Sequence, residues 1–325
     1  MEMSLTSKLG LDEWSASDKF DVASYIGFKF MNQRADKQQT LAKPIELSGI
    51  NLHNGEAVKL RLSPAEANHG IKFLRSDLKN GSRIITPKAN MVTETSMCTS
   101  LANEHDGLVS TIEHLMAAFH ATGISNCLVE VNGPELPILD GSAAPYVSGI
   151  CNAGLVNQGI KQKFIRVLKP IKVGDYQRSA QLSPHVNSDD VRLTVDFSIE
   201  FEATCIRAQN FYLDVTPSTF EQEISAARTF GFVEHLDALL SQGKAKGASQ
   251  TNAIVIKNGV VQNPGGLRYS DEFVRHKALD AVGDLYIEGL PLIGVYKGVR
   301  AGHDVTNRLM RKLISDPSNY ELTEI

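Results

Sequence analysis

The amino-acid sequence predicts an α+β protein made of two consecutive units of comparable size. Segments that alternate apolar and polar residues, which is typical of half-buried strands, are followed by segments with the 3.6-residue period of a helix, and this order occurs twice. The length of 325 residues also favours two domains. A hydrophobic content of 42% against 22% charged residues is enough to form their cores.

Composition excludes several classes of protein. The net charge of −4 arises from 37 acidic and 33 basic residues that are interspersed, so no basic stripe for nucleic acid stands out. The cysteines Cys98, Cys127, Cys151 and Cys205 form no CxxC pair, which indicates free thiols in a reducing compartment. No apolar run approaches the length of about 20 residues that spans a bilayer. We therefore expect a cytoplasmic protein with no transmembrane segment.

The first 37 residues differ in composition from the rest of the chain. They mix acidic and basic residues and contain the only tryptophan, Trp14. Their acidity argues against an organelle presequence, and no apolar core of a secretory signal is present. We interpret residues 1–37 as an N-terminal extension of unknown role, followed by a first domain over 38–160, a second over 161–315 and a tail over 316–325.

Hydrophobic periodicity predicts the elements of the first unit. Residues 58–62 (VKLRL) alternate apolar and polar side chains, and Pro64 and residues 68–70 (NHG) supply a turn before the alternation resumes. Apolar residues at i, i+3, i+4 and i+7 then mark an amphipathic helix. The expected elements are strands at 58–62, 71–73 and 127–131, a helix over 110–119 and a loop over 134–142.

The second unit has a similar order of patterns, although no internal repeat is strong enough to prove a duplication. Two strand-like segments precede two helical ones, and a further strand precedes the last helix. The expected elements are strands around 164–173, 191–201 and 253–256, and helices near 217–228, 232–242 and 276–284.

The segment 276–284 (HKALDAVGD) places three polar side chains on one stripe of its helix. His276, Asp280 and Asp284 are successive i, i+4 neighbours, and we expect this stripe to point away from the surface on which the helix packs. An imidazole and a carboxylate one turn apart can hold a divalent ion, and the second carboxylate can orient another group. The apolar face of the same helix consists of Leu279, Val282 and Tyr286.

Other polar residues have structural explanations when each is taken alone. Glu113 follows Ser110 by three residues, which is the spacing of a capping box that closes a helix N-terminus. His114 and His303 have the features of ordinary hydrogen-bonded or surface histidines, the latter in a glycine-flanked loop. Residues 228–232 (RTFGF) fit a turn packed by aromatic rings. No one of these signals is decisive.

Their combination is far more specific. The segments 110–115 (STIEHL), 134–145 (PELPILDGSAAP), 227–232 (ARTFGF) and 271–285 (DEFVRHKALDAVGDL) occur in a fixed order within residues 38–315. With these segments the chain resembles the UDP-3-O-acyl-N-acetylglucosamine deacetylases. The resemblance implies a zinc-dependent hydrolase of lipid A biosynthesis, which releases acetate from an acylated UDP-sugar. It also implies two domains, each a β-sheet layered against helices, with the active site at their junction.

The resemblance also implies a role for each polar residue of the site. His114, His276 and Asp280 would ligate zinc and leave a fourth position to water, although a set of two histidines and one aspartate also accepts iron(II). Glu113 would be the general base that takes the proton of that water. His303 would be the opposing cation that stabilises the oxyanion and protonates the leaving amine.

Further residues would support the catalytic groups and the substrate. Asp284 would keep His303 charged and oriented, and the hydroxyl of Thr229 would hydrogen-bond the tetrahedral intermediate. Lys277 and Arg300 would face the diphosphate. Phe230 would stack on the sugar and Phe201 on the nucleotide, and an acyl passage would be lined by Phe232, Val233, Leu236 and Leu239.

Alternatives and departures remain for some of these assignments. The apolar residues assigned to the acyl passage fit the buried face of an ordinary amphipathic helix equally well. Phe201 is followed by EAT where the family usually has a histidine-proline pair, and His303 is followed by DVT in place of alanine-leucine-asparagine. Both departures concern nucleotide binding.

The sequence disfavours two rival functions. A zinc peptidase is disfavoured because the chain contains no HExxH motif. A sugar-nucleotide-binding protein without catalysis is disfavoured because binding alone needs no acid and base on opposite sides of a metal. We expect a small-molecule substrate, no nucleic-acid partner and a monomer.

Overall fold

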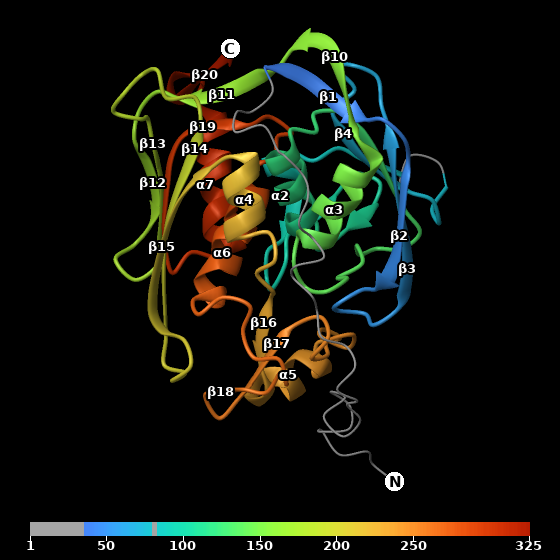
Figure 1. Cartoon of the computed structure of the whole chain (residues 1–325), viewed down its shortest axis with the longest axis vertical. Helices are drawn as coiled ribbons and strands as arrows, with labels where there is room; N and C mark the ends of the chain where they lie inside the picture. The colour runs from blue at the N-terminus through green and yellow to red at the C-terminus, as the bar shows by residue number, and fades with distance from the viewer. Residues whose placement is uncertain (1–35, 80–82) are drawn as a thin grey trace.

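The computed structural model describes residues 36–79 and 83–325, and it confirms the α+β class. Two large sheets lie on opposite sides of the molecule with helices between them (Figure 1). Most of the predicted N-terminal extension, residues 1–35, lies outside the described residues. In the described part of the chain, no helix is long and apolar enough to cross a membrane.

The first large sheet comes from the first half of the chain. Its strands in chain order are β2 (Ile45–Ile50), β3 (Ala57–Pro64), β4 (Ile71–Arg75), β5 (Ile84–Ile85) and β9 (Cys127–Val131). They are arranged in the order β2-β3-β9-β4-β5, and only β4 and β9 pair in parallel. In β3 the apolar residues of the alternating pattern are buried, which confirms the predicted strand at 58–62.

The second large sheet comes from the second half of the chain. Its strands are β11 (Lys163–Val167), β12 (Ile171–Gly174), β13 (Ser179–Ser183), β14 (Leu193–Phe201), β15 (Arg207–Val215), β19 (Leu292–Val299) and β20 (Tyr320–Glu324). The long strand β19 is central, because it pairs with β11 and β14 in parallel and with β13 antiparallel. The single strand predicted at 164–173 is wrong: it is divided into β11 and β12, and Pro170 between them has no N–H for a ladder.

Three small sheets complete the strand structure. They are the pair β1 (Lys37–Leu41) and β10 (Leu155–Lys161), the set β6 (Val92–Glu94), β7 (Ser100–Ala102) and β8 (Leu108–Val109), and the set β16 (Phe230–Phe232), β17 (Ile254–Lys257) and β18 (Val260–Val261). The 3₁₀ helices of the described residues are η3 (Ala89–Met91), η4 (Val233–His235) and η5 (Pro317–Asn319). The antiparallel pairing of β1 with β10 brings the two ends of the first unit together.

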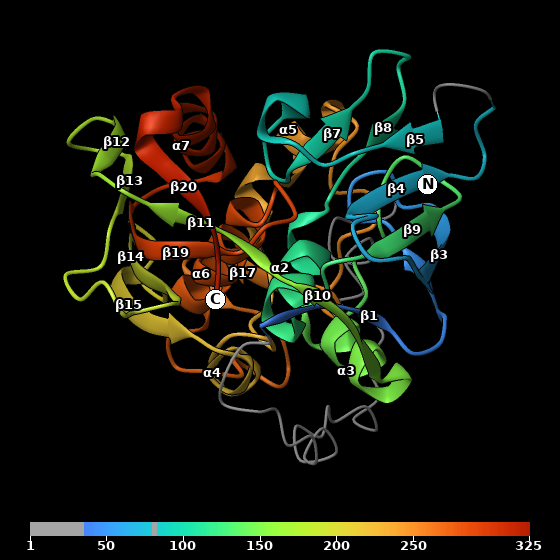
Figure 2. The ribbon, with the colours of Figure 1, turned by 90° about the horizontal axis from the view of Figure 1, so that it is seen from above.

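The helices form the middle of the molecule. They are α2 (Glu113–Thr122), α3 (Ala144–Ala153), α4 (Pro217–Glu223), α5 (Leu236–Ser241), α6 (Glu272–Leu285) and α7 (His303–Ser315). Helix α2 packs on α3 and α6, and α7 lies beside β12 and β13, as Figure 2 shows from above. All ten residues of α2 are buried, as expected of a helix covered on every side.

Three helix predictions need correction. The helix predicted near 217–228 ends at Glu223, because the chain must then leave the helix to reach β16, which pairs with β17. The helix predicted near 232–242 is replaced at its start by the end of β16 and by η4, and only α5 is α-helical. The polar stripe of α6 does not point away from its packing surface, because α6 is covered on almost every side and the stripe is buried.

Candidate metal centre and active site

Three side chains from α2 and α6 converge on one point. His114 lies in the first turn of α2, and His276 and Asp280 lie one turn apart on α6. Nε2 of His114 and Nε2 of His276 lie 3.5 Å and 3.4 Å from Oδ1 of Asp280. One potential donor atom from each residue lies within 4.8 Å of the others, and all three residues are buried.

The donor set fits a divalent metal ion. Oδ1 of Asp280 is buried and has no hydrogen-bond partner, which is costly unless a cation meets it. Burial lowers the pKa of His276 to about 3, so its imidazole is neutral at pH 7, as a ligand must be. Two imidazoles and one carboxylate with a further position open are typical of hydrolytic metal sites. Within residues 36–79 and 83–325 this is the one His/Cys/Asp/Glu group of this kind.

Hydrogen bonds from outside the donor set orient the candidate ligands. Nδ1 of His276 lies 3.0 Å from the carbonyl oxygen of Ala227, so a proton on Nδ1 leaves Nε2 free to bind a cation. The ammonium of Lys277 donates to Oδ2 of Asp280 at 2.5 Å. Burial raises the pKa of Asp280, but the neighbouring charges, Lys277 among them, hold it well below its usual range. The carboxylate is therefore ionised and turned toward both imidazoles.

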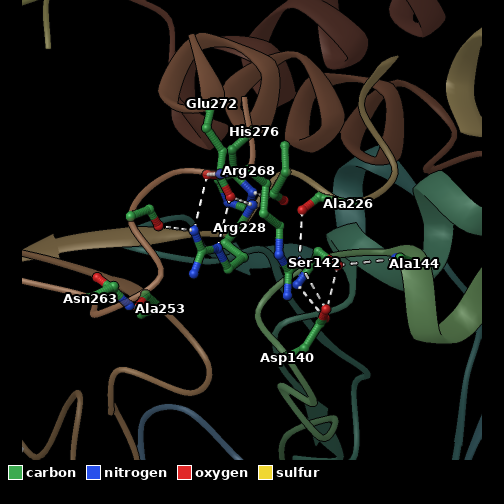
Figure 3. Close-up of polar contacts among 12 residues, drawn as sticks. Asp140, Ser142, Ala144, Ala226, Arg228, Ala253, Asn263, Arg268, Glu272 and His276 are labelled. Atoms are coloured by element: carbon green, nitrogen blue, oxygen red, sulfur yellow. Dashed lines mark hydrogen bonds and ion pairs between the residues drawn. The ribbon is translucent and has the colours of Figure 1, made fainter. Parts of the chain in front are cut away.

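A buried ion-pair network supports this geometry (Figure 3). Arg228 donates Nε and Nη2 to the two carboxylate oxygens of Glu272 at 2.8 and 3.1 Å, and its backbone N–H donates to the same carboxylate at 3.0 Å. Nη1 of Arg268 donates to Oδ2 of Asp140 at 2.9 Å. Since Arg228 follows Ala227, these bonds hold the carbonyl that orients His276 and link it to the loop before α3.

Glu113 is the first residue of α2, and its carboxylate is buried beside the ligands. Oε2 accepts the backbone N–H of Thr99 at 3.0 Å. The predicted capping box with Ser110 is wrong, because Ile112 is the N-cap and Ser110 instead accepts a hydrogen bond from Ser100. Burial raises the pKa of Glu113, and the charges of nearby histidines lower it in part. A carboxylate of this kind can accept a proton near neutral pH.

His303 and Asp284 form a buried pair next to the ligands. Nδ1 of His303 donates to Oδ2 of Asp284 at 2.8 Å. Burial lowers the pKa of His303, but the charge and hydrogen bond of Asp284 outweigh this effect and raise the pKa to about 9. The imidazole is therefore charged at pH 7. The glycine-flanked surface loop considered for His303 is not observed, because the residue begins α7 and is 7% exposed.

The close approach of α2 and α6 depends on a glycine. A Cβ atom at Gly283 would lie 2.0 Å from the carbonyl oxygen of Glu113 and 3.1 Å from its Cα. No side chain fits this contact without displacing the start of α2. The contact therefore sets the separation of the ligands that the two helices contribute.

We expect Gly283→Ala to damage both the fold and the site. The new methyl group must displace backbone, a strain of about 1–3 kcal/mol or more, and it moves Glu113 and His114 away from α6. Thermal unfolding and metal titration should show a lower melting temperature and weaker metal affinity. The matched control is Gly265→Ala, because nothing lies within 4 Å of its Cβ position. Equal stability and affinity in the two variants would contradict this account.

A cavity of about 600 Å³ opens onto the candidate metal centre. Its wall includes eleven of the residues predicted from the sequence, namely Glu113, His114, Phe201, Thr229, Phe230, Phe232, Leu239, His276, Lys277, Asp280 and His303. The rings of Phe201, Phe230 and Phe232 contact one another with centroids 5.7 to 6.4 Å apart. They give the cavity an aromatic part next to its charged groups, a composition suited to a ligand with apolar and anionic parts.

The structure does not bring four predicted residues to this wall. Arg300 pairs with Glu200 at 3.2 Å. Leu236 is buried against Val255, and Val233 packs on the same small cluster. This position fits the alternative stated for these two residues, the buried face of an ordinary amphipathic helix. Asp284 lies behind His303.

Sequence reasoning missed other residues of the cavity. Arg178, in the turn between β12 and β13, lies on the wall and donates to the carbonyl oxygen of Arg300 at 3.2 Å and to Oδ1 of Asp304 at 3.0 Å. The segment Thr95, Ser96 and Met97 also lines it. A lone arginine in a turn and a short polar segment have no local pattern that could have identified them.

Comparison with known proteins identifies the family of this chain. The family model described as UDP-3-O-acyl N-acetylglycosamine deacetylase matches residues 38–315. A UDP-3-O-acyl-N-acetylglucosamine deacetylase of Histophilus somni is 43% identical over 287 residues, which cover 88% of this chain and 92% of that protein. A protein of the same name from Brucella melitensis is 42% identical over 289 residues, covering 88% of this chain and 98% of the relative. The chain therefore belongs to the UDP-3-O-acyl N-acetylglycosamine deacetylase family.

Proposed function

We propose that this chain hydrolyses the N-acetyl group of UDP-3-O-(3-hydroxyacyl)-N-acetylglucosamine and releases acetate, a step of lipid A biosynthesis. Family membership supports the substrate and the reaction. The observation on which the proposal depends most is a three-donor metal site with a buried carboxylate and a charged histidine on the wall of one cavity. Metal-assisted amide hydrolysis uses such a set: an ion to activate water, a base to take its proton and an acid to protonate the leaving amine.

His114, His276 and Asp280 would hold the ion, and we propose zinc, with iron(II) as the alternative for the same donors. When bound, the ion would acidify a water molecule and polarise the amide carbonyl. Glu113 would take the proton of that water, and its raised pKa favours this transfer. His303 would stabilise the developing oxyanion and then donate its proton to the leaving amine.

Substrate contacts are proposed from the cavity wall. Phe230 and Phe201 are suited to the sugar and the nucleotide, and the hydroxyl of Thr229 to the tetrahedral intermediate. Lys277 would stand near the diphosphate, although its ammonium already pairs with Asp280. Arg178 is a further cation on the wall.

We also propose a cytoplasmic monomer with domains over 38–160 and 161–315. The four cysteines are free thiols, which supports a reducing compartment. Light scattering on the purified protein tests the assembly, and stable fragments in limited proteolysis test the boundaries.

The direct test is acetate release measured together with metal content. The acylated UDP-sugar should be deacetylated by metal-loaded protein, and UDP-N-acetylglucosamine without the acyl chain should be a much poorer substrate. Bound metal without any turnover would favour a sugar-nucleotide-binding protein instead. Reconstitution of the metal-free protein with zinc or iron(II) then identifies the more active ion.

The pH dependence of turnover tests the pair of Asp284 and His303. Activity should fall as the pH rises through the pKa of His303, because the neutral imidazole no longer donates a proton. Asp284→Asn removes the negative charge that raises this pKa, so the alkaline limb of kcat/KM should move to lower pH at equal metal loading. A limb that stays in place would exclude this role for Asp284. A limb that survives in His303→Ala would belong to another group.

A further inference from the structure

Thr99 lies where the cavity wall meets the catalytic groups. It stands immediately before β7, and the neighbouring Thr95, Ser96 and Met97 line the cavity. The residue itself is only 3% exposed. Its side chain therefore cannot contact a substrate extensively, and its contacts are internal.

Three polar residues of the site contact Thr99 at once. Its backbone N–H donates to Oε2 of Glu113 at 3.0 Å. Its hydroxyl donates to Oδ1 of Asp284 at 2.6 Å, and the same oxygen lies 3.2 Å from Nδ1 of His303. Glu113 begins α2, Asp284 lies near the end of α6 and His303 begins α7. A single residue thus contacts groups from three helices.

The numbers of donors and acceptors determine how Thr99, Asp284 and His303 are bonded. A threonine hydroxyl has one proton and accepts through its lone pairs. The hydroxyl proton of Thr99 goes to Oδ1 of Asp284. The hydroxyl oxygen of Thr99 can then accept a share of the Nδ1–H of His303, which Oδ2 of Asp284 accepts at 2.8 Å. Both oxygens of Asp284 are then occupied, and its carboxylate plane cannot rotate without breaking a charge-assisted bond. The orientation of the His303 ring follows from the orientation of this plane.

We propose that Thr99 is a positioning residue for the hydrolysis, whose hydroxyl fixes the Asp284–His303 pair while its backbone N–H fixes Glu113. This inference rests on the proposed function, in which Glu113 and His303 act on opposite sides of the scissile amide. A displacement of about 1 Å in such groups can cost on the order of a hundredfold in rate. Thr99 therefore holds the base, Glu113, and the acid, His303, in a fixed relative position without contacting the reacting atoms.

The test compares Thr99→Val, Thr99→Ser and a control. Valine keeps the shape and the backbone N–H but removes the hydroxyl, and serine restores the hydroxyl. The matched control is Thr194→Val, because Thr194 is 1% exposed and also donates to an aspartate, Oδ1 of Asp214, at 2.6 Å. This aspartate pairs with Arg192 and not with His303. All proteins are compared at equal metal loading, with melting temperatures measured alongside.

We expect Thr99→Val to lower kcat about ten- to a hundredfold with little change in KM, since it leaves a charged partner without its bond. Thr99→Ser and Thr194→Val should stay within about threefold of the wild type. In the His303→Ala background, Thr99→Val should lower kcat by less than about a further twofold, because the Thr99 hydroxyl acts through that histidine.

Two results would overturn the inference: a Thr99→Val rate no lower than that of Thr194→Val, or a full additional loss in the His303→Ala background. Failure of the proposed function is distinguishable, because the metal-loaded wild type itself would then release no acetate.

Discussion

Asp280→Ala is expected to lose bound metal and hydrolysis together. The carboxylate is one of the three proposed donors, and its Oδ1 lies within 3.5 Å of both imidazole nitrogens. Removing it leaves two imidazole donors, too few to hold an ion firmly in a site that keeps a position open for water. We expect less than about a tenth of the wild-type metal content after dialysis, with activity reduced at least in proportion. His276→Ala should behave in the same way.

Metal analysis and acetate release on the same preparation provide the measurement. Asp196→Ala is a suitable control, because that carboxylate pairs with Lys297 at 3.4 Å, outside the cavity wall. It should retain both metal and activity. Stoichiometric metal in Asp280→Ala or His276→Ala would remove that residue from the ligand set.

Glu113→Gln is expected to show the opposite combination, with metal retained and turnover lost. The amide oxygen of glutamine can still accept the N–H of Thr99, so the local geometry survives. It cannot accept a proton from water, and loss of a general base typically costs about 10² to 10⁴ in rate. We expect kcat to fall at least about a hundredfold while metal content stays near that of the wild type.

Glu135→Gln is the matched control for this substitution. Glu135 is 1% exposed and also accepts a backbone N–H, that of His53, but it does not line the cavity. Its variant should retain turnover per folded, metal-loaded molecule. Loss of metal in Glu113→Gln would indicate a ligand or structural role, and near-normal turnover would assign the proton transfer to another group.

The spacing of apolar residues along the sequence was enough to predict some strands and helices. The strand at 58–62 and the helix that holds His276 and Asp280 follow from side-chain spacing, and both are present. The same spacing could not show which faces are covered. The polar stripe of α6 is buried because α2 presents His114 to it from more than 150 positions earlier, a contact that no local pattern encodes.

The candidate site required more than periodicity. Taken alone, Glu113 fitted a capping box and His303 a surface loop, and the family resemblance carried by four segments assigned both to one site. Thr99 and Arg178 were missed because no motif contains them. Thr99 and Arg178 enter the site through turns that only the folded chain brings together.

The contact of Gly283 with Glu113 has a thermodynamic consequence. Because α2 belongs to the first half of the chain and α6 to the second, the donor set is complete only when the halves are docked. Ion binding and docking are then linked equilibria, and linkage is reciprocal. By this reciprocity, an ion that binds the docked form more tightly would stabilise the interface between the halves by the same free energy.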